Sequence, residues 1–145
     1  MIIKIPGIPI AQKRHRHTKV GGFVRVYDPS AKDKVSIIGK IKASLFIHNS
    51  IDPQQYPIFH AGHAIYVDMT FDMPIPVSFS KAKRKRCIEG DEPHTSKPDL
   101  DNLSKIFLDC MNGLIFNDDA QVVTLLCHKK YSEDPKTIIE INTVM

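Results

Sequence analysis

The chain has 145 residues, of which 42% are hydrophobic and 25% are charged, which excludes a disordered protein and predicts a single globular domain over residues 1–145. No apolar run approaches the roughly 20 residues of a membrane span, so we expect no contact with a membrane. The three cysteines, an odd number without a Cys-x-x-Cys pair, predict reduced thiols and a cytoplasmic protein.

The first half of the chain predicts strands around one helix. Residues 1–10 are typical of an edge strand, because prolines and a glycine interrupt them. Residues 19–27 predict a hairpin that turns at a Gly-Gly pair. The helical spacing of apolar residues predicts a helix over 30–48. Alternating apolar and polar residues over 65–73 predict a strand with one buried face.

The second half begins with residues 77–98, which show no hydrophobic period, and we expect a long, mobile basic loop there. Residues 99–113 predict an amphipathic helix that ends at Gly113. Two strands are predicted over 122–131 and 137–144. This order of elements predicts an α+β fold, in which two main helices pack on a small mixed β-sheet.

Two basic segments stand out against a net charge of only +4. Residues 1–27 carry six lysines and arginines and no acid, and five of the six residues from Lys81 to Arg86 are basic. Such segments attract a polyanion, for which nucleic acid is the obvious candidate, and solvated loops are the alternative. The candidate DNA-binding residues are Lys13, Arg14, Arg16, Lys81, Lys83, Arg84, Lys85 and Arg86.

Two aromatic residues of the predicted hairpin, Phe23 and Tyr27, lie close to the first basic segment. An exposed aromatic ring can stack on an unpaired DNA base. Their pattern favours a packing role over stacking.

Four aspartates and a lysine lie on or beside the helix predicted over 99–113, namely Asp99, Asp101, Lys105, Asp118 and Asp119. Helical spacing places Asp101 and Lys105 on one polar stripe. Asp99 shares this region only if it adopts extended dihedral angles at the N-cap position. The chain after Gly113 can return Asp118 and Asp119 toward the same region.

Such a group of carboxylates is costly unless a cation joins it. Two unit charges about 4 Å apart repel by about 4 kcal/mol at an effective dielectric of about 20. Asp99, Asp101 and one of Asp118 and Asp119 therefore suit a Mg²⁺ or Mn²⁺ site that activates water against a phosphodiester, with Lys105 stabilising negative charge. Helix capping and a plain turn explain the same residues, and the residues alone favour that alternative.

The segment 98–105, Pro-Asp-Leu-Asp-Asn-Leu-Ser-Lys, is followed after about a dozen residues by Asp-Asp-Ala-Gln at 118–121. This pattern resembles the core signature of the RusA family of Holliday-junction resolvases, and residues 5–9 and 14–16 resemble the family's opening more weakly. The resemblance implies catalysis by Asp99, Asp101, Lys105 and Asp119. It implies that the three aspartates hold Mg²⁺ or Mn²⁺, with Asp118 as a further candidate ligand.

The resemblance also implies a homodimer that cuts four-way junction DNA by paired symmetric nicks, in DNA recombination and repair, and a phage or prophage origin. We therefore expect a metal-dependent endodeoxyribonuclease. Two alternatives stay open: a structure-selective nuclease for other branched DNA, and a non-catalytic basic DNA-binding module.

Overall fold

A four-stranded mixed sheet forms the centre of the structure, a computed structural model that describes residues 1–144. The strands lie in the order β1 (Ile2–Pro6), β6 (Lys136–Thr143), β4 (Ile65–Pro74) and β5 (Val122–Ser132). β4 and β5 run parallel, and the other two pairs are antiparallel. β1 is an edge strand, as its prolines predicted.

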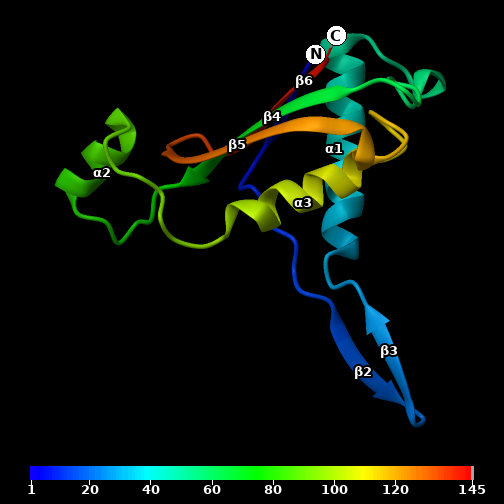
Figure 1. Cartoon of the computed structure of the whole chain (residues 1–145). Helices are drawn as coiled ribbons and strands as arrows, with labels where there is room; N and C mark the ends of the chain where they lie inside the picture. The colour runs from blue at the N-terminus through cyan, green and yellow to red at the C-terminus, as the bar shows by residue number, and fades with distance from the viewer. Residues whose placement is uncertain (145) are drawn as a thin grey trace.

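Two helices, α1 (Ala31–Asn49) and α3 (Leu100–Met111), cover one face of this sheet (Figure 1). The alternation predicted for β4 is confirmed, because its odd-numbered residues point into the core and most even-numbered ones lie at least partly exposed on the other face. The rings of Phe71 in β4 and Phe107 in α3 lie 5.6 Å apart. The mixed α+β fold is therefore confirmed. None of the described helices is long and apolar enough to cross a membrane.

A third helix, α2 (Lys81–Glu89), occupies part of the segment for which we predicted a loop without regular structure, so that prediction was wrong there. The Ser80 hydroxyl accepts a hydrogen bond from the Lys83 amide at 3.2 Å, and Gly90 ends the helix with a φ of 83°. Cys87 is its one buried residue. Capping interactions and surface ion pairs accompany this helix. It lacks an apolar stripe, so a search for hydrophobic periodicity does not find it. The mobility of the segment stays a prediction.

A separate hairpin of β2 (Arg16–Val20) and β3 (Phe23–Tyr27) projects away from the body of the molecule (Figure 1). Gly21 and Gly22 form its turn with φ values of 58° and 85°, which suit glycine in a tight hairpin. The packing role predicted for Phe23 and Tyr27 was wrong, because these residues are 79% and 42% exposed. All ten strand residues of the hairpin are exposed.

Candidate active site

The first turn of α3 carries two exposed aspartates. Asp99 is the N-cap residue with φ −72° and ψ 145°, the extended conformation that its convergence with Asp101 required, and its side chain makes no capping hydrogen bond. The Asp101 carboxylate accepts a hydrogen bond from the Asn102 amide at 2.9 Å. The positive end of the helix dipole favours negative charge at this position. The helix N-terminus therefore offsets part of the repulsion between these two carboxylates.

A lysine of β5 holds the segment that leads into Asp99. The Lys129 ammonium donates hydrogen bonds to the carbonyls of Ser96 at 2.7 Å and Pro98 at 2.9 Å. These bonds fix the backbone just before the N-cap. No local sequence pattern signals this contact, because 31 residues separate Lys129 from Pro98.

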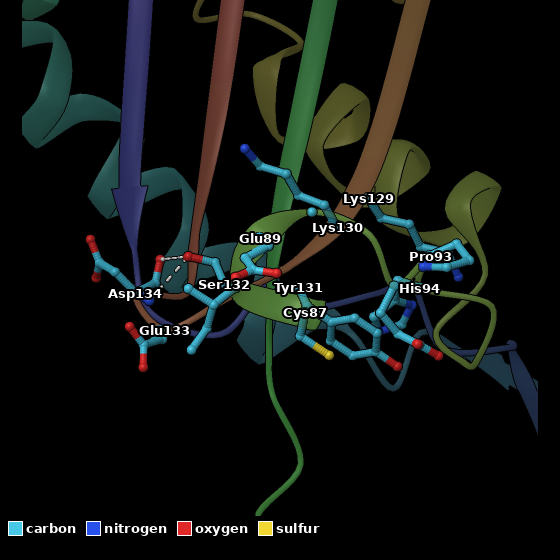
Figure 2. Close-up of a pocket in the computed structure, with 13 residues that line it drawn as sticks. Cys87, Glu89, Pro93, His94, Lys129, Lys130, Tyr131, Ser132, Glu133 and Asp134 are labelled. Atoms are coloured by element: carbon cyan, nitrogen blue, oxygen red, sulfur yellow. Dashed lines mark hydrogen bonds between the residues drawn. The ribbon is translucent and has the colours of Figure 1, made fainter. Parts of the chain in front are cut away.

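The same end of β5 lines a pocket of about 640 Å³ that it shares with α2 (Figure 2). The His94 ring lies 4.5 Å from the Tyr131 ring. Burial and the nearby charge of Lys129 lower the pKa of His94. None of the candidate catalytic aspartates lines this pocket. Asp99 and Asp101 are exposed on the surface of the protein, and Asp119 is half-buried.

Ion pairs continue along the polar stripe of α3 beyond Asp101. The Lys105 ammonium lies 3.6 Å from the Asp109 carboxylate. The other oxygen of Asp109 lies 3.1 Å from the ammonium of Lys34 in α1, which in turn lies 2.8 Å from Asp28. Burial lowers the pKa of Lys34, but the hydrogen bonds to Asp28 and Asp109 outweigh it and raise the pKa overall. This network fixes α3 against α1 and keeps Lys34 charged.

Two polar side chains hold the short 3-10 helix η2 (Asp119–Gln121): that of its N-cap residue Asp118 and that of its last residue Gln121. The Asp118 carboxylate accepts a hydrogen bond from the Ala120 amide at 2.9 Å, and the Gln121 side-chain oxygen accepts from the amides of Asn117 and Asp118. The Gln121 nitrogen donates to the carbonyls of His60 and His63.

The role of Gln121 was missed from the sequence, although a Gln three residues after an Asp is the spacing of a capping box. The reciprocal cap is made by Asp118 and Gln121, and the Asp119 carboxyl takes no part in it but contacts the Asp118 carboxyl.

Asp119 lies in a negative environment beside α3. Partial burial and the neighbouring carboxylates of Asp118 and Asp109 raise the pKa of Asp119, while the charge of Lys105 opposes the rise. The Ala120 amide and the hydrogen bond with Asp119 lower the pKa of Asp118. The charges of Lys105 and Asp109 come from α3, against which η2 packs.

Asp99, Asp101 and Asp119 do not form a ready-made metal site within the chain. No group of three or more His, Cys, Asp or Glu side chains between residues 1 and 144 is arranged to hold a metal ion. The donor chemistry nevertheless fits Mg²⁺, which prefers hard oxygen ligands and is usually held by one or two carboxylates plus phosphate oxygens. The Asp99 carboxylate makes no capping hydrogen bond, so its oxygens are available for such a cation.

The two basic segments differ in how far acids neutralise them. The Lys13 ammonium pairs with Asp33 at 3.0 Å, whereas Arg14 and Arg16 belong to none of the ion pairs among residues 1–144. Four of the five basic residues of α2 face an acid: Lys83–Glu92, Arg84–Glu133, Lys85–Glu89 and Arg86–Glu92, at 3.8, 3.9, 3.8 and 3.1 Å. The hairpin and α2 project in different directions (Figure 1).

Two comparisons with known proteins cover almost the whole chain. Residues 6–142 match the family described as Endodeoxyribonuclease RusA. The chain is also 34% identical over 140 residues to the uncharacterized protein YqaN of Bacillus subtilis (strain 168), and the alignment covers 95% of this chain and 92% of that protein. Both matches span the hairpin, α2 and the acidic residues around α3.

Proposed function

Because the chain belongs to the RusA endodeoxyribonuclease family, we propose that it is a metal-dependent nuclease that resolves four-way DNA junctions by paired symmetric nicks. The family itself implies a junction-resolving nuclease. The observation that carries the proposal is the acidic surface of α3, where Asp99 and Asp101 are exposed in the first turn and Lys105 and Asp119 follow. With a divalent cation bound, these carboxylates would no longer repel the phosphates of a DNA backbone.

In this proposal Asp99, Asp101 and Asp119 are the metal ligands, and Asp118 is a further candidate. A bound Mg²⁺ or Mn²⁺ supplies an activated water and polarises the phosphodiester. Because the three carboxylates are not gathered in the free chain, we infer that phosphate oxygens of the DNA complete the ligand set.

Hydrolysis at this site forms a bond between the water oxygen and phosphorus and breaks the bond between phosphorus and O3′. The water loses a proton and the departing 3′ oxygen gains one, so the products are a 5′-phosphate and a 3′-hydroxyl. Lys105 has an exposed ammonium group that stabilises the charge developing on the phosphate or the departing oxygen. Asp109 does not neutralise Lys105 fully, because it shares its charge with Lys34.

The partner in this proposal is a second copy of the chain, because a two-fold symmetric junction is best met by an isologous dimer with two sites. The free edge strand β5 supports this assembly. Its residues Val123, Leu125 and Leu126 are 60%, 39% and 43% exposed, and an exposed apolar edge strand favours contact with another chain.

A cleavage assay on three DNA forms of matched sequence tests this function. The purified protein is incubated with a four-way junction, a fork and a linear duplex, with Mg²⁺ or with EDTA. We expect two symmetric nicks in the four-way junction that depend on Mg²⁺. Equal rates on all three DNA forms contradict the junction assignment and favour a nuclease for branched DNA in general. Tight binding without cleavage of any form leaves the non-catalytic binding module.

A further inference from the structure

The β2–β3 hairpin has surface chemistry that the proposed cleavage reaction does not use. Its residues form a two-stranded sheet of their own, and all ten are exposed. A lone two-stranded hairpin is marginally stable at best in water. The hairpin adds little to the core, so its apolar side chains are not explained by packing.

One face of the hairpin combines arginines with aromatic rings. The register pairs Arg16 with Tyr27, Thr18 with Arg25, and Val20 with Phe23. Residues directly opposite one another in an antiparallel pair have side chains on the same face, and alternate pairs share that face. The recognition face of the hairpin is therefore made of Arg16, Thr18, Val20, Phe23, Arg25 and Tyr27.

Phe23 occupies the tip of this recognition face. It follows the Gly21-Gly22 turn directly and is 79% exposed. A two-stranded ribbon is narrow enough to enter the major groove of DNA. Proteins that distort DNA often insert apolar side chains between base steps. Phe23 is placed as such a wedge, because it follows the turn directly in a hairpin that projects away from the body of the protein (Figure 1).

The charge of the hairpin selects a polyanion as its partner. Arg16, Lys19 and Arg25 belong to none of the ion pairs found in the described part of the chain, and residues 1–27 contain no acid. A second copy of this chain has a net charge of +4, so the basic hairpin repels it electrostatically. DNA offers phosphates for the arginines and a flat base for the ring.

We propose that the β2–β3 hairpin enters the centre of a four-way junction, where Phe23 stacks on a base pair exposed at the branch point and Arg16 and Arg25 contact the flanking phosphates. This inference rests on the proposed function, because it requires that the substrate has a branch point. It assigns the preference for branched DNA to the hairpin and the chemistry to α3. A linear duplex has no exposed base-pair face at its centre, so Phe23 has no stacking partner there.

The test compares Phe23→Ala with Val24→Ala, a matched control whose residue is 60% exposed on the opposite face of the hairpin. Binding to a four-way junction and to a linear duplex is measured in EDTA, so that no cleavage occurs. A 2-aminopurine base next to the branch point reports stacking. Because base–aromatic stacking contributes about 1–3 kcal/mol per base, we expect Phe23→Ala to lose about tenfold in junction affinity and to change duplex affinity less than about twofold.

The fluorescence change that the wild-type protein causes at the branch point is expected to disappear in Phe23→Ala and to persist in Val24→Ala. Both variants are exposed substitutions, and circular dichroism checks that they fold. Loss of the wild-type dimer in Phe23→Ala, measured by light scattering, identifies the tip as a contact between copies and overturns the inference.

Two further outcomes separate this inference from the proposed function. A wild-type protein that prefers junctions, with a Phe23→Ala variant that keeps the full preference, overturns the hairpin inference alone. A wild-type protein that binds junctions no better than duplexes and does not cut them with Mg²⁺ overturns both.

Discussion

Asp118 and Gln121 cap each other across the short helix η2. The Asp118 carboxylate accepts a hydrogen bond from the Ala120 amide at 2.9 Å, and the Gln121 side-chain oxygen accepts from the Asp118 amide at 3.3 Å. The residues of the Asp-Asp-x-Gln motif therefore have different roles. The first aspartate and the glutamine hold the backbone, and the Asp119 side chain takes no part in this cap.

Gln121→Ala tests this positioning role. The substitution removes bonds to two amides and to the carbonyls of His60 and His63. Because a typical hydrogen bond contributes about 1 kcal/mol net and four are removed, we expect the free energy of unfolding in urea to fall by at least that amount. Junction cleavage should fall as well, since Asp119 loses its fixed backbone. Gln121→Glu keeps the acceptor and is expected to retain more activity, and equal activity of Gln121→Ala and wild type contradicts the role.

Asp119→Asn is expected to abolish cleavage without loss of stability. The raised pKa of Asp119 shows that its burial and the charges of Asp118 and Asp109 disfavour its ionised form. Removing the charge therefore leaves the free energy of unfolding at pH 7 unchanged or slightly higher. Loss of a residue that hydrogen-bonds to a metal ligand lowers metal affinity or activity about 10–100-fold. Loss of the ligand itself should lower the cleavage rate at least that much. Reduced stability of the variant in urea indicates instead that Asp119 has a structural contact.

His94 is expected to titrate below the ordinary value of 6.5, because burial and the charge of Lys129 lower its pKa. The neutral ring then stabilises the fold above pH 6.5, and this contribution is lost as the pH falls through the lowered pKa. Nuclear magnetic resonance of the ring protons measures the pKa directly. Lys129→Met removes the positive charge, so the pKa of His94 should rise while burial still keeps it below its usual value. No change in Lys129→Met contradicts the proximity of the two groups.

The two basic segments are expected to differ in their salt dependence. Each phosphate contact contributes about 0.9 to the slope of log affinity against log salt concentration. Arg25→Ala should therefore reduce the slope by about that amount. Arg84→Ala should reduce it less, because Glu133 lies 3.9 Å from the Arg84 side chain. Binding isotherms at several salt concentrations measure both slopes, and a larger effect of Arg84→Ala reverses this ranking.

Much of the fold was predictable because the hydrophobic pattern decides it. The alternation along β4 and the apolar stripe of α3 both describe faces that the core buries. α2 lacks such a face, since Cys87 is its one buried residue. Its boundaries were nevertheless marked in the sequence by the capping residues Ser80 and Gly90. A search for hydrophobic periodicity does not use such capping residues.

The site was predictable only in part, for a related reason. The extended N-cap conformation of Asp99 follows from local rules, and it is confirmed. The Lys129 bonds to Ser96 and Pro98 depend on how β5 lies beside the segment before α3, which no local pattern encodes. The exposure of Phe23 was mispredicted because an apolar residue in a hairpin normally has a second sheet or a helix to pack against.

In the proposed reaction, the carboxylates at the start of α3 hold the divalent metal with which the protein hydrolyses DNA. Asp101→Asn tests this role, with Asp91→Asn as a matched control at an exposed aspartate outside that helix. Cleavage of a four-way junction in Mg²⁺ and binding to the same junction in EDTA are measured for both variants and for the wild type. We predict that Asp101→Asn loses cleavage and keeps or tightens binding, while Asp91→Asn matches the wild type. Unchanged cleavage by pure Asp101→Asn protein contradicts the claim.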